Sequence, residues 1–235
     1  MPGPADGVPP VAVVIPAFQA AATIAAVVSR ARRAVPEGIV YVVDDGSSDR
    51  TGEAGRGAGA RLIERPRNRG KGAALATGIA AALAGGAGVI VTLDADGQHP
   101  PEDIPRLVAP VATGDADLVL GARARTRAMP MGRRCTNWVS AALASRIGGE
   151  PVPDAQTGFR ALSRRAAEAI RPHELRYDYE TAFLLEALRR GFRVRSVPVA
   201  TVYEGRPSYF RHWADTWRLA RVFTRYGREI IFGAR

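Results

Sequence analysis

Two pairs of aspartates stand where apolar runs of the chain end. Asp44 and Asp45 follow one such run, and Asp94 and Asp96 follow another. In an open parallel sheet, ligands bind beyond the carboxyl ends of the strands. If the runs are strands of such a sheet, both acidic pairs face the ligand site. Neighbouring carboxylates repel each other there unless a cation or a proton lies between them.

The second pair has the spacing of a metal site. In an extended chain, residues i and i+2 point the same way, so Asp94 and Asp96 can converge on one ion. Their oxygens suit Mg²⁺ or Mn²⁺ held together with substrate phosphates, and Gln98 can add a neutral oxygen. A plain turn is the competing interpretation, because Asp and Gly are common in turns. A second aspartate pair at another strand end makes the turn the weaker explanation.

Lys71 is the only lysine of the chain and lies between two glycines in the motif NRGKG. Flanking glycines allow close approach to a ligand, and an ammonium group suits a phosphate or a base carbonyl. The motif lacks the spacing of a P-loop. Taken alone, an ordinary surface lysine is the simpler interpretation.

The elements that would position these residues alternate along the first half of the chain. The apolar runs are continuous, as in strands buried on both faces. Their alternation with helical patterns predicts an α/β fold with a mostly parallel sheet flanked by helices. The second half is less regular. Strands are expected at residues 11–15, 39–43, 60–63, 89–93, 117–120 and 193–199, and helices at 23–33, near 49, and at 71–83, 101–108, 137–147 and 179–190.

The composition is that of a single globular domain. The chain has 235 residues, of which 46% are apolar and 24% charged. It has no run of about 18 apolar residues, the length that spans a membrane. Cys135 is the only cysteine, which excludes an internal disulfide and favours a reducing cytoplasm. The net charge of +10 favours a polyanionic partner, such as phosphates, a nucleic acid or an acidic membrane surface.

Eight motifs occur in the order known from one enzyme family. The set resembles glycosyltransferase family 2, the inverting enzymes of GT-A fold. The later motifs look most like the polyprenyl-phosphate transferases of the dolichyl-phosphate mannose synthase group. The resemblance implies a Rossmann-like sheet in a catalytic domain over residues 11–205. The motifs, which cover roughly residues 11–210, are VVIPAF, VVDDGSSDRT, NRGKGAAL, LDADGQHPPEDI, DLVLGAR, DAQTGFRAL, YDYETAFLLEALRRGFRV and VPVATVYEGRPSYF.

The resemblance implies roles for residues that bind the donor. Pro16 and Phe18 would line the nucleotide pocket, Asp44 and Asp45 would hold the base and ribose, and Lys71 would lie near the base.

The resemblance also implies a metal and diphosphate site. Asp94 would contact the ribose or the metal, and Asp96 would bind the metal on the diphosphate. Gln98 would complete the metal's shell, and Arg206 would close over the diphosphate.

The remaining motif residues would serve the transferred sugar and the acceptor. They are Asp154 and Arg160, facing the sugar and phosphates; Glu180, beneath the acceptor; and Arg123, Arg133 or Arg134, and Ser208, around the acceptor phosphate.

Two departures from the family pattern stand out. Residues 19–21 are Gln-Ala-Ala where the family commonly has Asn-Glu-Glu, so a carboxylate that often touches the nucleotide is missing. A basic residue often follows the serine of the last motif, whereas here Tyr209 follows Ser208. The first departure leaves the base of the donor open.

The expected reaction moves a sugar from a nucleotide-diphosphate sugar, of the GDP-mannose or UDP-glucose type, to a polyprenyl phosphate. Mg²⁺ or Mn²⁺ on Asp96, helped by Arg206, would stabilise the charge of the leaving diphosphate. A phosphate monoester, with a second pKa of about 6, is largely anionic at neutral pH and needs arginines rather than a base. The arginines within residues 123–134 suit this task, and a merely solvated basic loop is the alternative.

A second activity within the family is transfer to a sugar hydroxyl in polysaccharide or glycolipid synthesis. A hydroxyl acceptor needs a general base. Asp154 is the first candidate for that base, and Glu180 is the second.

The two ends of the chain differ from the catalytic region. Residues 1–10 read as a flexible leader rich in proline and glycine, and residues 206–235 as a basic amphipathic helical tail. Trp and Phe on one face, with arginines around them, are typical of a helix in a membrane interface. Docking on the protein's own core is at least as good an explanation, and a second subunit is another. A cytoplasmic location is expected, at the anionic membrane surface if the tail binds lipid.

Two other classes of protein fit part of the pattern. Nucleotide-sugar pyrophosphorylases share the parallel sheet and the acidic metal site. They need a glycine-rich loop with an arginine directly after the first strand, and IPAFQAAATI provides none. A non-enzymatic nucleic-acid binder would gather its basic residues into one stripe with stacking aromatics. The acidic strand ends argue against that, so no nucleic-acid partner is expected.

Overall fold

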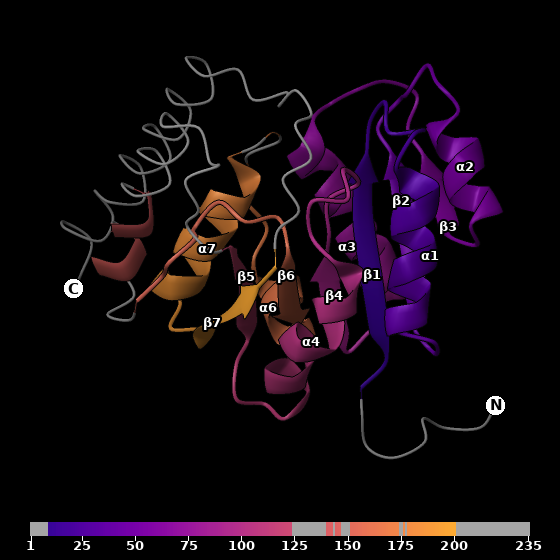
Figure 1. Cartoon of the computed structure of the whole chain (residues 1–235). Coiled ribbons are helices and arrows are strands. Elements are labelled where there is room, and N and C mark those ends of the chain that lie inside the picture. Colours follow the sequence, from indigo (N-terminus) through magenta and orange to yellow (C-terminus); the bar gives the residue numbers. More distant parts are fainter. Residues whose placement is uncertain are drawn as a thin grey trace.

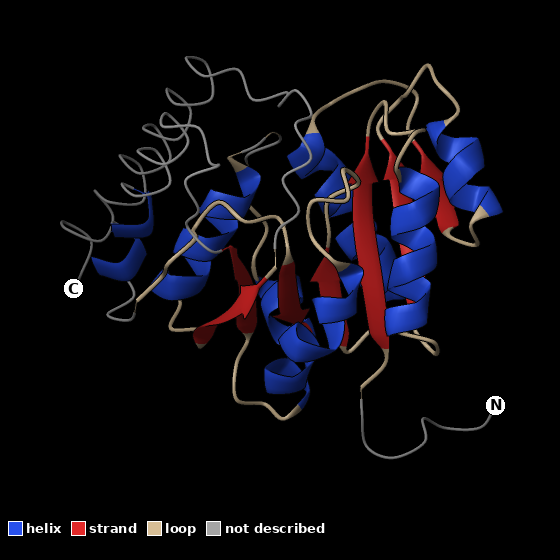
Figure 2. Cartoon of the chain, viewed as in Figure 1, coloured by secondary structure: helices blue, strands red, loops and turns tan. Residues whose placement is uncertain are grey.

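A single mixed sheet organises the chain. The computed structural model describes residues 9–123, 140–142, 144–146, 151–173, 176 and 178–200. Within these residues, seven strands form one sheet in the order β3-β2-β1-β4-β6-β5-β7 (Figure 1). Helices cover both faces of the sheet (Figure 2). The predicted α/β fold with a mostly parallel sheet is therefore confirmed.

All strands but one run in the same direction. β1 pairs in parallel with β2 and β4, β2 with β3, and β5 with β7, whereas β6 runs antiparallel between β4 and β5. The carboxyl ends of the six parallel strands therefore share one edge of the sheet with the amino end of β6. The strands are β1 (Val11–Ala17), β2 (Ile39–Asp44), β3 (Arg61–Glu64), β4 (Val89–Thr92), β5 (Leu118–Arg123), β6 (Arg160–Ser163) and β7 (Val194–Val199).

The helices form two layers because successive residues of each strand point to opposite faces. Val13 of β1 packs into the core under α1 and α4, and Val14 packs into the core under α3, α6 and α7. None of the helices in the described residues is long and apolar enough to span a bilayer. The helices are α1 (Ile24–Ala34), α2 (Thr51–Gly57), α3 (Lys71–Ala84), the 3₁₀ turn η2 (Pro101–Asp103), α4 (Ile104–Ala112), α6 (Arg164–Ala169) and α7 (Tyr179–Arg189).

The first strand continues through Pro16, where the sequence predicted its end. The carbonyl of Val14 accepts a hydrogen bond from Leu93 N, so the backbone N–H and C=O groups of the even-numbered residues of β1 point toward β4. Pairing with β4 ends at Val14, whereas pairing with β2 continues to Ala17. The missing N–H of Pro16 therefore points beyond the end of the β4 ladder, and no strand hydrogen bond is lost there.

The sequence analysis missed β6 and α6, which follow directly on each other. β6 is only four residues long and begins with a buried arginine, so it lacks the apolar run used to find the other strands. Ser163 does cap α6, accepting a hydrogen bond from Ala166 N at 3.1 Å. A serine before an alanine-rich segment is a recognised helix start, and this feature of the sequence could have predicted α6. The expected helix at 137–147 is helical in its described parts, residues 140–142 and 144–146.

Candidate active site

The carboxyl edge of the sheet collects most of the residues singled out in the sequence. Asp44 ends β2, Arg123 ends β5 and Arg160 begins β6. Asp94 follows β4 after one residue, so both aspartate pairs lie at this edge, as predicted. Two helices begin here as well: Lys71 is the first residue of α3 and Glu180 the second of α7.

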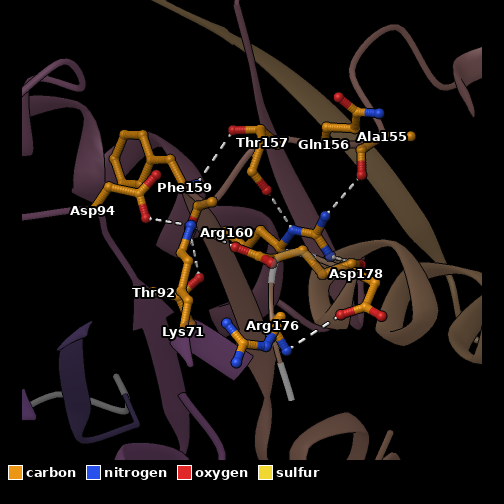
Figure 3. Close-up of polar contacts among 12 residues, drawn as sticks. Lys71, Thr92, Asp94, Ala155, Gln156, Thr157, Phe159, Arg160, Arg176 and Asp178 are labelled. Atoms are coloured by element: carbon orange, nitrogen blue, oxygen red, sulfur yellow. Dashed lines mark hydrogen bonds and ion pairs between the residues drawn. The ribbon is translucent and has the colours of Figure 1, made fainter. Parts of the chain in front are cut away.

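Lys71 forms the centre of a partly buried charge cluster (Figure 3). Its Nζ lies 2.6 Å from Asp94 Oδ1 and 2.5 Å from Glu180 Oε1. Burial alone would lower the pKa of Lys71, but the charges of the two carboxylates outweigh it and raise that pKa. Lys71 in turn holds the pKa of Asp94 below its usual value against the effect of burial. One ammonium therefore ties α3 to the loop after β4 and to the start of α7.

The backbone at Gly158 forms the floor of this cluster. A Cβ added there would lie 2.6 Å from Asp94 Oδ2 and 2.8 Å from Lys71 Nζ. Thr92 Oγ1 donates a hydrogen bond to the carbonyl of Gly158 at 2.8 Å, which fixes the approach. A side chain at this position would push the ion pair apart.

A second buried ion pair joins the end of β5 to the segment before β6. The Nε and Nη2 of Arg123 donate to the two carboxylate oxygens of Asp154 at 2.6 and 3.2 Å. The side chains are 10% and 1% exposed. Burial would raise the pKa of Asp154, but the Arg123 charge outweighs it and lowers that pKa. Asp154 is therefore a carboxylate that positions an arginine, and it is a weak base.

Arg160 is buried rather than turned toward open solvent. It is 2% exposed, and its guanidinium donates to the carbonyl oxygens of Thr157, Glu180 and Ala155 at 2.8, 2.5 and 2.9 Å (Figure 3). Burial lowers the pKa of Arg160 to about 10, and the charges of Glu180 and Asp154 oppose that effect. Arg160 thus fastens the loop before β6 to the first turn of α7.

His99 is a site residue that the sequence analysis did not single out. It is 3% exposed, and its ring centroid lies 5.5 Å from that of Phe159. Burial lowers the pKa of His99 to about 4, partly opposed by the charge of Asp94. Nδ1 is buried and has no hydrogen-bond partner among the described residues. Its place in DGQHP, directly after the predicted metal residues, was the signal that could have found it.

The first aspartate pair is bound within the protein. Asp45 is 2% exposed and accepts hydrogen bonds from the backbone N–H groups of Arg69 and Gly70, the second at 2.8 Å. It also pairs with Arg65 Nη1 at 3.0 Å. Gly70 has φ of 101°, a left-handed conformation that favours glycine, so the glycine before Lys71 shapes the start of α3. Asp44 Oδ1 accepts from Ser47 N at 3.0 Å.

The two residues predicted to line the nucleotide pocket lie at the end of β1 and directly after it. Pro16 is buried, whereas Phe18 is 43% exposed. Gln19 has φ of 52°, and its backbone N–H donates to Ser47 Oγ at 3.0 Å. The Gln-Ala-Ala segment that replaces the family's Asn-Glu-Glu is thus fastened to the loop after β2. The backbone N–H of Ala20 donates to Thr51 Oγ1 at 2.7 Å.

The predicted metal residues form a turn. Asp96 is exposed, and its Oδ1 accepts a hydrogen bond from Gln98 N at 2.9 Å. Because the segment is not extended, the i, i+2 alternation does not govern where Asp94 and Asp96 point. In the described part of the chain, no three His, Cys, Asp or Glu side chains form a metal cluster. Two carboxylates, one of them exposed, fit Mg²⁺ or Mn²⁺ if a substrate's phosphates supply further oxygens.

Four of the predicted site residues lie outside the described residues, as does the basic tail over residues 206–235. They are Arg133, Arg134, Arg206 and Ser208.

The sequence of the chain matches the model of one enzyme family. Residues 12–171 match the family model Glycosyl transferase family 2. The match covers more than half of the chain, and the chain belongs to this family. It is a hexosyltransferase of the dolichyl-phosphate sugar synthase-like group.

Relatives of similar length support this placement. An uncharacterised protein from Methanocaldococcus jannaschii is 36% identical over 197 residues, which is 81% of either chain. The undecaprenyl-phosphate mannosyltransferase of Micrococcus luteus is 31% identical over 201 residues, covering 80% of this chain and 82% of that one.

Among solved structures, glucosyl-3-phosphoglycerate synthase from Mycobacterium tuberculosis in complex with phosphoglyceric acid has a TM-score of 0.76 at 26% identity. The match covers 93% of this chain and 80% of that one. A structure of the same synthase with Mn²⁺, uridine diphosphate and phosphoglyceric acid has a TM-score of 0.75 at 25% identity.

Proposed function

We propose that this glycosyltransferase moves a hexose, with inversion, from a nucleoside-diphosphate sugar to a polyprenyl phosphate. The observation that carries the proposal is the placement of Asp94 and Asp96 after β4 and of Arg123 at the end of β5, on one sheet edge. One strand separates β4 from β5, so these strand ends are roughly 10 Å apart. That distance leaves room for the transferred sugar between a donor diphosphate and an acceptor phosphate.

On the donor side, Asp96 and Asp94 would hold Mg²⁺ or Mn²⁺ on the diphosphate, with Gln98 in reach of the same shell. The metal, when bound, supplies positive charge to the leaving diphosphate. Mn²⁺ and uridine diphosphate accompany the related synthase structure, which supports this assignment. Lys71 holds Asp94 in place at 2.6 Å, so the carboxylate is oriented before the donor arrives.

Pro16 and Phe18 would line the nucleotide pocket. The exposed ring of Phe18 offers a surface on which a base can stack. Asp44 and Asp45 would shape the base and ribose site through the loops they bind, and Arg206 would close over the diphosphate.

On the acceptor side, Arg123 would orient the acceptor phosphate, with Arg133, Arg134 and Ser208 as further proposed contacts. Asp154 orients Arg123 through two hydrogen bonds. A phosphate monoester is already largely anionic at neutral pH, with a second pKa of about 6, and attacks without a general base. The lowered pKa of Asp154 makes it a poor base for a hydroxyl acceptor, which favours the phosphate.

The first test is a panel of nucleotide sugars with Mn²⁺ and undecaprenyl phosphate, followed by the Asp96→Ala variant. Transfer to the lipid phosphate is expected, with kcat reduced about 10²- to 10³-fold in the variant, the typical loss when one electrostatic stabiliser is removed. Full activity of Asp96→Ala would refute the metal role. Asp115→Ala, which removes an exposed aspartate at the opposite edge, is the matched control.

A second candidate acceptor is a soluble phosphorylated hydroxy acid. Phosphoglyceric acid is bound in the related synthase structure, which is the observation that favours it. Phosphoglycerate therefore belongs in the acceptor panel. Transfer to phosphoglycerate but not to undecaprenyl phosphate would replace the first proposal with the second, and a general base would then be required.

A further inference from the structure

The proposed reaction assigns no role to the buried imidazole of His99. The ring is 3% exposed and packs against Phe159, with 5.5 Å between the ring centroids. Nδ1 is sealed from solvent and has no hydrogen-bond partner among the described residues. A buried polar group without a partner costs stability, so its retention beside the candidate active site points to a use.

The ring of Phe159 fixes where this imidazole lies. Phe159 directly precedes β6, the strand that separates β4 from β5. Its carbonyl accepts a hydrogen bond from Gly121 N of β5 at 2.8 Å. The preceding carbonyl, that of Gly158, accepts one from Thr92 Oγ1 of β4 at 2.8 Å. His99, packed on Phe159, therefore lies between the carboxyl ends of β4 and β5.

This position is between the proposed donor and acceptor phosphates. Asp94 and Asp96 follow β4 on the donor side, and Arg123 ends β5 on the acceptor side. Burial is the main cause of the lowered pKa of His99, and the charges of Asp94 and Arg123 act on that pKa in opposite directions. The ring is therefore within electrostatic range of both sides, where the transferred hexose is expected.

The sealed nitrogen indicates which ring nitrogen of His99 carries the proton. A neutral imidazole has one N–H donor and one bare nitrogen. With the proton on Nδ1, a buried N–H would lack an acceptor, whereas with the proton on Nε2 only a lone pair is left unpaired, the less costly arrangement. Within the described residues Nε2 makes no hydrogen bond, and it is not among the sealed atoms. The ring therefore retains one uncommitted N–H donor, at Nε2.

We propose that His99 Nε2 donates a hydrogen bond to a hydroxyl group of the transferred hexose and thereby helps to select the donor sugar. The assignment rests on the proposed function, which places the hexose between the two strand ends. A hydroxyl suits a neutral donor, whereas phosphate oxygens form stronger hydrogen bonds with cations. A hexose that lacks this hydroxyl leaves the imidazole unpaired, which is a loss that enzymes use for selectivity.

The test measures what the sugar adds to donor binding. The dissociation constants of UDP and UDP-glucose, and of GDP and GDP-mannose, are measured by calorimetry with the full-length protein and Mn²⁺, without acceptor. The ratio of the nucleotide constant to the nucleotide-sugar constant reports on the hexose. His99→Phe keeps a planar ring and removes the donor. The ratio is expected to fall about three- to tenfold for the sugar that is bound, the usual effect of one lost hydrogen bond.

Two amide variants distinguish a hydrogen bond from a packing effect. His99→Gln can place an amide N–H near the position of Nε2 and is expected to keep most of the wild-type ratio. His99→Asn reaches only the position of Nδ1 and is expected to lose it. This comparison decides the question even if His99→Phe does not fold. His173→Phe, at an exposed histidine, is the control and is expected to keep the wild-type ratio.

Two results would overturn the contact with the hexose. Equal weakening of UDP and UDP-glucose, and of GDP and GDP-mannose, in the His99 variants would place the contact on the nucleotide or its diphosphate. A ratio in His99→Gln no higher than in His99→Asn would mean that packing, and not an N–H at Nε2, matters.

The outcomes separate this contact from the reaction. A ratio that responds to His99 as expected, without transfer to undecaprenyl phosphate or phosphoglycerate, would support the contact and refute the proposed function. Transfer with the same ratio in the wild type and all three His99 variants would support the function and refute the contact. Failure of both nucleotide sugars to bind would refute the function and the contact together.

Discussion

At both edges of the sheet an aspartate pairs with an arginine or a lysine, but the two edges differ in how exposed the cation is. At the amino edge, Asp117 binds Arg165 at 2.8 Å and the backbone N–H of Arg193 at 3.0 Å, and those two arginine side chains are 66% and 60% exposed. At the carboxyl edge the cations are mostly buried as well. Lys71 is 18% exposed and Arg123 is 10% exposed.

This difference distinguishes ion pairs with a structural role, at the amino edge, from ion pairs that hold charges in place for a reaction, at the carboxyl edge. An ion pair with a solvated cation contributes little as a charge pair, so the value of Asp117 lies in satisfying buried hydrogen bonds. A pair that is largely removed from water carries a large desolvation penalty and is often no more stabilising than apolar side chains of the same size. We infer that the carboxyl edge retains its pairs because the reaction needs charges in fixed positions.

Removal of the central cation has the largest expected effect. Lys71→Met leaves the buried Glu180 carboxylate and the partly buried Asp94 carboxylate without their partner, which is expected to lower the free energy of unfolding by about 3 kcal/mol. Urea denaturation measures this change, and transferase activity is expected to be lost. Lys71→Arg retains the charge and is expected to recover part of the stability. Wild-type stability of Lys71→Met would show that the cluster is not a coupled unit.

The floor of the cluster gives the next largest effect. Gly158→Ala places a methyl group against Asp94 and Lys71, and a displacement of about 1 Å in a catalytic group can reduce kcat about 10²-fold. Steady-state kinetics with a saturating donor measures the loss. Gly57→Ala is the control, because a Cβ there meets nothing within 4 Å. Equal kcat values in the two variants would contradict the role assigned to the Gly158 backbone.

A substitution at the amino edge is expected to lower the stability of the protein and to leave its activity unchanged. Asp117→Ala leaves the backbone N–H of Arg193 without its acceptor and is expected to lower the free energy of unfolding by about 2 kcal/mol. Transferase activity at a temperature well below the unfolding transition is expected to equal that of the wild type. A loss of kcat would mean that the two edges are coupled, contrary to the comparison above.

The smallest effect concerns pH. His99 has a pKa of about 4 in the folded protein, below the usual value of 6.5. Between those values the unfolded chain binds the proton that the folded protein excludes, so stability rises with pH through this window and is lost as pH falls. The contribution is at most about 1.4 kcal/mol per pH unit. Denaturation midpoints between pH 5 and 7 are expected to depend less on pH in His99→Gln, and parallel profiles would contradict the assignment.

Local pattern was enough to predict much of the fold. Continuous apolar runs marked the strands at residues 11–15, 39–43 and 89–93, because a strand buried on both faces has no polar alternation. The acidic pairs at Asp44 and Asp94 could be placed on the ligand edge, since parallel strands end at the same side. The structure confirms the three strands and places both acidic pairs at the carboxyl ends of parallel strands.

The strand order and the contacts across it depended on tertiary structure. β6 is short and runs antiparallel between β4 and β5, and no local pattern in the sequence predicts this position. That insertion brings Gly158 against Lys71 and carries Arg160 to the start of α7. The sequence by itself determined the α/β class and the acidic strand ends, because these follow from local periodicity. Only the tertiary structure decided which charged side chains form ion pairs, because those contacts join residues that are distant in the chain.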